Sequence, residues 1–326
     1  MRSGQRSPIV LPGFMLAYYV HDLSPFLIRF TDAIAIRWYG LAYVAAFFVG
    51  ILIVKSLSRR GYCDIPEAKV ADFILGGAIF GVLLGGRLGY MLFYNWDGLI
   101  HDPVSIFRVW DGGMSAHGGM IGLTLYTGWY SWRSRISWRN IADSVVVAAP
   151  LGLFLGRLAN FINGELYGRV TNVPWAVQFP KELYTAPPET VALALQESTS
   201  INPAWNSVDA IIEASRDSEP LRAALAGILS PRHPSQFYEA FLEGALLFAV
   251  LWLLRTRVRL PNGVLTAIFF FGYALLRSIA EFFREPDAPL TGSLTRGQFL
   301  SIFLILIGLG FLVAAMIKPS YPRGQS

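Results

Sequence analysis

Seven long apolar segments constrain this 326-residue chain more than any other feature. A helix rises about 1.5 Å per residue, so about 20 apolar residues cross the bilayer's hydrocarbon core of roughly 30 Å. Backbone groups in lipid must satisfy their own hydrogen bonds, which favours helices for segments of this length. We therefore expect an all-α polytopic membrane protein with seven transmembrane helices. The expected spans are 34–57, 69–94, 114–132, 140–161, 235–254, 263–283 and 298–317.

The loops indicate how these helices are oriented. Clusters of Lys and Arg follow the first, third, fifth and seventh segments. Cytoplasmic loops of membrane proteins carry the excess of basic residues, so we expect the N-terminus outside and the C-terminus in the cytoplasm. The net charge of +5 is then a topology signal and not a nucleic-acid footprint.

The spans divide the chain into five expected regions. These are an outer N-terminal arm (1–33), helices 1–4 (34–163), an outer head insert (164–232), helices 5–7 (233–318) and a cytoplasmic tail (319–326). Within the head we expect a short strand near 173–179 and amphipathic helices near 207–216 and 221–229. The alternative, a disordered linker, fits the apolar content of the insert less well.

Polar side chains inside the spans gather near one face of the membrane. An intramembrane arginine costs about 2.5–3.5 kcal/mol at the centre of an inserted helix and is a functional hypothesis by default. The cytoplasmic halves offer only Asp72 and Asp143. Helical rise from each point of entry places the other groups at the level of the outer headgroups. They are Arg37, Tyr39, Arg87, His117, Arg157, Asn160, Tyr238, Glu239, Glu243, Tyr273, Arg277 and Glu281.

At that level we expect four arginines to face three glutamates, which leaves room for an anion. The planar guanidinium suits bidentate contact with phosphate. Structural roles are the alternative. Arg157 would pair with Glu239 or Glu243, and Arg277 would satisfy Glu281 four residues along its helix. Arg87 would reach to the interface, and the tyrosines would be ordinary interfacial aromatics.

Two further motifs carry polar groups at the outer face. The segment 156–168 runs from a helix exit through two asparagines, Asn160 and Asn163, to Glu165 and Gly168. His117 stands among glycines that let a ligand approach, and an imidazole accepts a proton near neutral pH. The other histidines share no ligand spacing with it, so no metal site is expected. Cys63, the single cysteine, has no base beside it in sequence and is expected to be inert.

Several motifs together resemble the prolipoprotein diacylglyceryl transferases, bacterial inner-membrane enzymes. The closest correspondence is the segment 156–168, in which Ala159 replaces a glycine common in the family. The other matching motifs are 37–41, 85–90, 107–119, 232–236 with 238–239, and 281–287. The arm and residues 182–230 of the head match the family poorly.

The resemblance implies transfer of the diacylglyceryl group of phosphatidylglycerol to the lipobox cysteine of a secreted precursor, with release of glycerol phosphate. It places the enzyme in the bacterial inner membrane, with its site toward the periplasm and with no cofactor. The residues carried over by position are Tyr39, His117, Arg157, Asn160, Glu165, Gly168, Arg277 and Glu281.

From the chemistry of that reaction we assign roles to the residues. Arg157 and Arg277 are expected to clamp the phosphate and stabilise the leaving group, and His117 to accept or position the thiol proton. Tyr39, Asn160 and Asn163 would orient the headgroup. The remaining substrate residues are Glu165, Gly168, Arg87 and Tyr273, and the supporting residues are Glu239, Glu243, Glu281 and Arg284.

Two further expectations complete this assignment. Glu165, Glu239 and Glu281 are expected to hold the arginines, and Gly168 to permit the turn into the head.

The two functional classes that compete with a transferase are an anion or lipid transporter and a scaffold that binds precursors without reacting. A transporter site is expected near the midplane on repeated broken helices, and no such repeat is visible.

Overall fold

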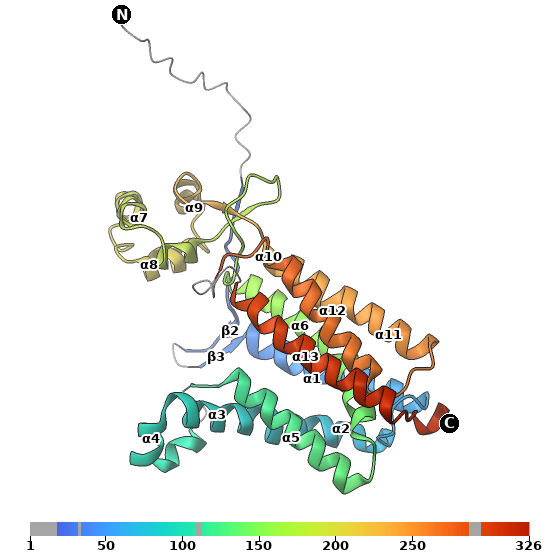
Figure 1. Cartoon of the computed structure of the whole chain (residues 1–326). Coiled ribbons are helices and arrows are strands. Elements are labelled where there is room, and N and C mark those ends of the chain that lie inside the picture. The colour runs from blue at the N-terminus through green and yellow to red at the C-terminus, as the bar shows by residue number, and fades with distance from the viewer. Residues whose placement is uncertain (1–17, 32–33, 109–111, 287–294, 326) are drawn as a thin grey trace, which may run out of the picture.

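The computed structural model describes residues 18–31, 34–108, 112–286 and 295–325. Within them the chain is mostly helical and forms a helix bundle, a separate layer of helices and a small head (Figure 1). Much of the predicted arm lies outside the described residues. The same holds for the motif positions 109–111 and 287.

The bundle gathers the first predicted span and the last four. It contains α1 (Trp38–Arg59), α6 (Trp138–Ile162), α10 (Ser235–Glu239), the π-helix η5 (Ala240–Leu246), α11 (Leu247–Arg257), α12 (Val264–Ala280) and α13 (Arg296–Ile317). Its apolar core includes Val54, Leu57, Ile141, Leu251 and Leu265. Helix α6 is the central element, since it contacts α1 and helices α10 to α12.

A second layer lies to one side of this bundle (Figure 1). The helix α2 (Glu67–Gly76) continues through the π-helix η1 (Gly77–Leu83) into α3 (Leu84–Tyr94), and α5 (Ala116–Ser134) packs along it. Between α3 and α5 the chain forms α4 (Trp96–His101) and a 3₁₀ turn, η2 (Pro103–Phe107). Small residues allow the close packing, because a Cβ on Gly85 would lie 2.8 Å from the Cα of Gly122.

The helices support a polytopic membrane protein. Five of the helices in the described ranges are long and apolar enough to cross a membrane, namely α1, α2 through α3, α6, α10 through α11, and α13. The other two expected spans are also helical. Of these, α12 is apolar but only 17 residues long, and α5 is not among the five. The count of seven spans and their orientation stay predictions.

The insert between α6 and α10 is folded, which contradicts the alternative of a disordered linker. It contains η4 (Pro180–Tyr184), α7 (Pro188–Ile201), α8 (Val208–Ala214) and α9 (Glu219–Ala226). Its own core includes Leu183, Ala194, Ile211, Leu221 and Leu225. Helices α8 and α9, whose N-caps are Ser207 and Ser218, lie close to the predicted helices at 207–216 and 221–229, whereas α7 was not predicted.

Short strands join the N-terminal segment to this head. Strand β1 (Tyr19–Val20) pairs in parallel with β4 (Val177–Gln178), and β4 pairs antiparallel with β5 (Pro231–Arg232). A separate antiparallel pair, β2 (Phe26–Arg29) and β3 (Ala35–Arg37), leads into α1. Residues Tyr19–Val20 of the arm are therefore part of the sheet of the head.

The opposite end of the bundle is closed by buried polar contacts. Asp143 is fully buried rather than near water, because it accepts hydrogen bonds from the backbone N–H groups of Gly263 and Thr266, each at 2.8 Å, and faces Arg255 at 3.7 Å. Cys63 is also buried, and this burial raises the pKa of its thiol, consistent with the expected inertness. The last described residues form the 3₁₀ turn η6 (Arg323–Gln325).

His21 makes the head sensitive to acid. Its ring packs between Phe161 and Phe179, and its Nε2 lies 2.7 Å from the carbonyl oxygen of Phe161. Burial lowers the pKa of His21 to about 4, so the folded head holds the neutral ring. An unfolded histidine titrates near 6.5, so the unfolded state binds the extra proton as the pH falls from about 6.5 to 4. The stability that the neutral ring of His21 contributes to the folded head is therefore fully present above about pH 6.5 and is lost as the pH falls toward about 4.

We expect acid to lower the free energy of unfolding of the head by about 3 kcal/mol in the parent protein. His21→Gln should remove most of this loss, because glutamine does not titrate. Hydrogen exchange of 177–183 and 208–226 at pH 7 and pH 4.5 measures this. His101→Gln, at an exposed histidine, is the control. Equal acid sensitivity in the parent protein and His21→Gln would contradict the assignment.

Candidate active site

Six ionisable side chains meet where three bundle helices approach the head. Arg157 comes from the last turns of α6, and Glu239 and Glu243 from α10 and η5. Arg277 comes from the end of α12, and Glu281 follows as its C-cap residue. Arg284, three residues further on, completes the group. We call these six residues the Arg–Glu cluster.

Glu239 is at the centre of the Arg–Glu cluster. Its Oε2 lies 2.8 Å from Nη2 of Arg157 and 3.2 Å from Nη1 of Arg277. Both of its oxygens accept hydrogen bonds from Nη1 of Arg284, each at 3.1 Å. A carboxylate that is fully buried is retained only where its charge is compensated in this way.

The two other glutamates hold the same arginines from different sides. Glu243 lies one turn after Glu239 and contacts Arg157 at 3.2 Å and Arg277 at 3.4 Å. Glu281 faces Nη2 of Arg277 at 2.7 Å, four residues along the chain. Each of the two principal arginines is therefore fixed by at least two carboxylates.

Close helix packing makes this convergence possible. Glu239 ends α10 and Glu243 lies within the π-helix η5, an element that occurs often at functional sites. Helix α13 closes over the cluster at Gly297, where a Cβ would lie 2.8 Å from Oε2 of Glu281 and 3.0 Å from Nε of Arg277. Any side chain at position 297 would push into the cluster.

The formal charges of the cluster balance, three arginines against three glutamates. This differs from the expected excess of arginine, because Arg37 and Arg87 are elsewhere and Arg284 takes part. The arginines are nevertheless the more accessible members: the side chain of Arg157 is 17% exposed and that of Glu239 only 1%. Within the described chain Arg157 uses only Nη2 for these contacts. Its Nε and Nη1, which carry three of its five N–H bonds, make no hydrogen bond there.

The segment after Arg157 forms a second polar group at the same end of α6. Glu165 accepts hydrogen bonds from Nδ2 of Asn160 at 3.0 Å and of Asn163 at 3.4 Å. The expectation that Glu165 holds an arginine is wrong, since it holds these two asparagines. The side chain of Gln236, which sequence reasoning did not assign to the site, donates to the Glu165 carbonyl at 2.8 Å. Its presence in the motif 232–236 was the available signal.

The chain turns out of α6 at Gly164, where φ is +64°, and at Leu166, where φ is +59°. A non-glycine residue in this region is uncommon and often marks a constrained functional segment. Gly168 has a different role from the expected turn. Its N–H donates to the carbonyl of His233 at 2.8 Å and its backbone bridges to Arg284, so a Cβ there would strike His233.

Of three other predicted residues, Tyr273 lies beside the cluster, whereas Tyr39 and His117 make no hydrogen bond or ion pair with its members. Tyr273 is one turn before Arg277 on α12, and its hydroxyl is within electrostatic range of Glu243 and Arg157. Tyr39 lies in the first turn of α1 and packs against Tyr43, with ring centroids 5.2 Å apart. His117 is exposed in the first turn of α5 and makes no hydrogen bond or ion pair with the described residues.

Arg87 is not brought to the cluster. It is buried and donates hydrogen bonds to the carbonyls of Ser105, Ile106, Gly112 and Gly113. These carbonyls belong to the loop between α3 and α5. The guanidinium therefore ties that loop to α3, and it neither snorkels to the interface nor presents a free edge to a substrate.

One further arginine links the head to this end of the bundle. Arg232 of β5 contacts Glu182 at 2.7 Å and Glu285 at 3.1 Å, and its guanidinium lies over the ring of Tyr167 at 5.0 Å. These carboxylates raise the pKa of Arg232, against the effect of its burial. The contact orients the head over the segment 160–168.

The chain is similar to known proteins over most of its length. The family model described as "Prolipoprotein diacylglyceryl transferase" matches residues 25–314, which include every residue of the Arg–Glu cluster. Three similar relatives carry the name phosphatidylglycerol–prolipoprotein diacylglyceryl transferase. The relative from Gluconobacter oxydans is 38% identical over 321 residues, covering 96% of this chain and 97% of its own length.

The relatives from Gluconacetobacter diazotrophicus and Neisseria gonorrhoeae are each 39% identical. Their alignments cover 89% and 91% of this chain and 89% and 98% of their own lengths. Identity at this level over nearly the full length extends through the bundle, the second layer and the head. The chain belongs to the prolipoprotein diacylglyceryl transferase family.

Proposed function

We propose that this protein transfers the diacylglyceryl group of phosphatidylglycerol to the lipobox cysteine thiol of a prolipoprotein, at the periplasmic side of the bacterial inner membrane. Family membership and the names of the relatives support the reaction and its two substrates. The observation that carries the site assignment is the Arg–Glu cluster. It holds a partly exposed Arg157 in a fixed orientation with N–H donors to spare.

In the proposed reaction the thiol sulfur attacks the glycerol carbon that bears the phosphate ester. The C–S bond forms as the C–O bond breaks, and the electron pair of that bond leaves with the phosphate oxygen as glycerol phosphate. Cationic donors that are already oriented lower the barrier, because negative charge develops on that oxygen. Arg157, with Arg277 behind it, is placed to supply them.

The carboxylates serve the arginines in this proposal. Glu239 and Glu243 hold Arg157 by one nitrogen and leave the rest of its guanidinium for the lipid phosphate. Arg277 is held on both terminal nitrogens and is 11% exposed, so it contributes mainly through its charge. The pair Asn160 and Asn163, oriented by Glu165, supplies amide groups to the polar headgroup.

His117 is proposed to take the proton of the thiol. A thiol with a pKa near 8.5 is mostly protonated at neutral pH, so a base increases the thiolate fraction. His117 is exposed at the start of α5 and has no competing contact in the described chain. Tyr39 is the other polar side chain proposed to contact the headgroup, from the start of α1.

Replacing this histidine tests the assignment. His117→Gln keeps hydrogen bonding but loses basicity, and we expect kcat to fall about 10²-fold or more, the usual contribution of a general base. The loss should shrink as the pH rises past the thiol pKa, because the thiolate then forms without help. His101→Gln is the matched control. Wild-type turnover by His117→Gln at pH 7 would remove His117 from this role.

The reaction itself is tested with purified protein, glycerol-labelled phosphatidylglycerol and a lipobox peptide. Formation of a thioether together with free glycerol phosphate is expected. Lipid flux across proteoliposomes without lipid turnover would indicate the transporter alternative. Capture of the peptide without a thioether would indicate the scaffold alternative.

A further inference from the structure

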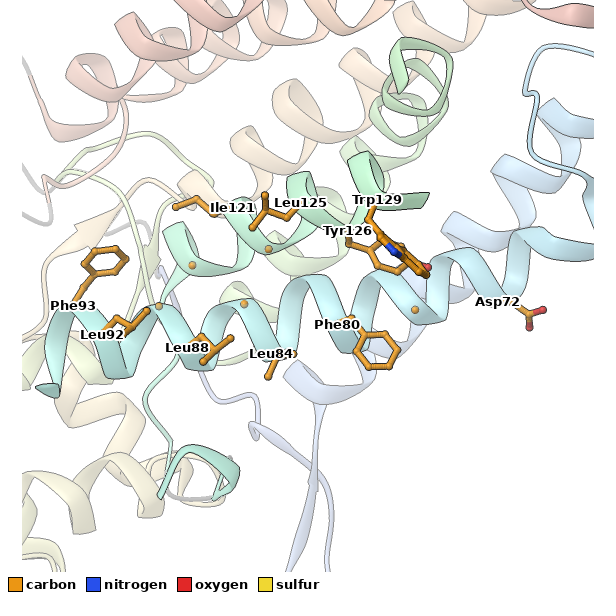
Figure 2. Close-up of a pocket in the computed structure, with 15 residues that line it drawn as sticks. Asp72, Phe80, Leu84, Leu88, Leu92, Phe93, Ile121, Leu125, Tyr126 and Trp129 are labelled. Carbon is orange, nitrogen blue, oxygen red and sulfur yellow. The ribbon is translucent and has the colours of Figure 1, made fainter. Parts of the chain in front are cut away.

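The second layer carries a long apolar groove that the cluster does not use. It has a volume of about 840 Å³ and is lined by α2, η1 and α3 on one side and by α5 on the other. Phe80, Leu84, Leu88 and Leu92 form one row, each four residues after the last, and Ile121, Leu125 and Trp129 form the other. Figure 2 shows both rows and the single charged lining residue, Asp72.

Small residues shape the floor of this groove. Gly85 and Gly89 of α3 face Gly118 and Gly122 of α5, so at these four positions the two backbones touch and no side chain stands between the rows. The two rows of large side chains are the walls of the groove and the glycines are its floor, so the groove runs parallel to the helices. Helices pack by placing the ridge of one into such a groove of another.

The two ends of the groove differ in chemistry. Asp72 marks one end, where it is exposed and makes no hydrogen bond or ion pair with the described residues. The other end lies near Leu92 and Phe93 (Figure 2). Gly118, which also lines the groove, directly follows His117 in the chain. From position 72 to 92 the helical rise is about 30 Å, the thickness of the whole hydrocarbon core. By the predicted topology, Asp72 lies on the cytoplasmic side.

We propose that this groove seats the apolar signal helix of the prolipoprotein substrate, an inference that depends on the proposed function. A signal peptide has a basic N-terminal region followed by an apolar segment of about 7–15 residues. In this arrangement the basic region of the signal peptide lies against Asp72 and its apolar helix lies between the two rows. The cysteine to be modified follows the apolar helix and is thereby brought to His117.

A phospholipid tail matches the groove less well. One acyl chain reaches about halfway through a core of roughly 30 Å, whereas the groove runs through both leaflets. Asp72 would also repel an anionic headgroup at the cytoplasmic face. The basic residues nearby, Lys69 and Arg133, do not line the groove, so the charge within it is negative.

Photocrosslinking in membranes tests the location. We expect Leu88→benzoylphenylalanine and Leu125→benzoylphenylalanine to crosslink a precursor whose lipobox cysteine is replaced by serine. The controls are Ile79→benzoylphenylalanine and Leu83→benzoylphenylalanine, two exposed residues on the continuous helix that carries Leu88 that do not line the groove. Crosslinks to lipid or to a second copy of the protein at Leu88, or precursor crosslinks at the controls instead, would overturn the proposal.

Charge reversal tests the orientation. For Asp72→Lys we expect the KM for a precursor with a basic N-terminal region to rise roughly tenfold, equivalent to about 1.4 kcal/mol. The KM for phosphatidylglycerol should not change, and a precursor with an acidic N-terminal region should restore the lower KM. Equal KM values for both precursors in the parent protein and in Asp72→Lys would contradict the orientation.

Thioether formation by the parent protein, measured in the same membranes with the unmodified precursor, separates the two proposals. Thioether product with no crosslink from the groove would leave the proposed function in place and remove the groove from it. Crosslinks from the groove without any thioether would support precursor docking and remove the transfer reaction.

Discussion

Arg157→Lys is expected to lower kcat by about 10²-fold or more while the protein still folds. Loss of one preorganised donor to a developing oxyanion typically costs this much. Lysine keeps the positive charge but lacks the planar fork, so it cannot pair with Glu239 and Glu243 and also present further N–H groups to a phosphate. The measurement is the rate of glycerol phosphate release with phosphatidylglycerol and a lipobox peptide.

The matched control for this substitution is Arg59→Lys. Arg59, the last residue of α1, forms an exposed ion pair with Glu67 at 2.7 Å, and exposed pairs contribute about 0–1 kcal/mol to stability. Arg59→Lys should leave turnover unchanged. Thermal unfolding in detergent distinguishes a catalytic loss from a folding defect. Near-normal turnover by Arg157→Lys would show that the guanidinium does not contact the leaving group.

Glu239→Gln is expected to have the largest effect on stability. Glutamine preserves the volume but removes the charge that three arginines share at 2.8–3.2 Å. The cluster would then hold three arginines against two glutamates, and removing one partner of a buried pair typically costs about 3–5 kcal/mol. Thermal or denaturant unfolding in detergent micelles measures this loss.

A compensating double variant separates charge from shape. Arg284→Gln alone should also destabilise, because it leaves Glu239 with one cation fewer. The double variant Glu239→Gln with Arg284→Gln restores neutrality and should lose less than the two single losses combined. Glu67→Gln, at an exposed pair, should change stability by less than about 1 kcal/mol. Additive losses in the double variant would mean that the charges are not coupled.

The elements predicted best are those with the strongest local signal. Long apolar runs give helices at the predicted positions, as α6 and α13 show, because a buried or lipid-facing backbone has few other ways to satisfy its hydrogen bonds. Helices α8 and α9 were also anticipated from their amphipathic pattern. Helix α7 was missed, since its polar and apolar residues give a weaker pattern and its partner, α9, is distant in sequence.

The site was predicted in part. The sequence placed Arg157, Arg277, Glu239, Glu243 and Glu281 at one level of the membrane, and the structure brings all of them together. The sequence could not show which further arginine joins these five residues. Arg284 follows α12 and returns to Glu239, whereas Arg87 turns to the carbonyls of its own loop. Helical depth fixes a level, but only packing fixes which side chains face each other.

The sequence by itself determined the long apolar helices, the family and the residue types of the Arg–Glu cluster, because lipid solvation and buried charge leave few alternatives for such segments. Only the tertiary structure decided how the arginines are partnered, that Glu165 holds Asn160 and Asn163, and that α3 and α5 together line an apolar groove. These are contacts between residues far apart in the chain or across a turn. Their geometry depends on helix packing and backbone direction, which local sequence does not encode.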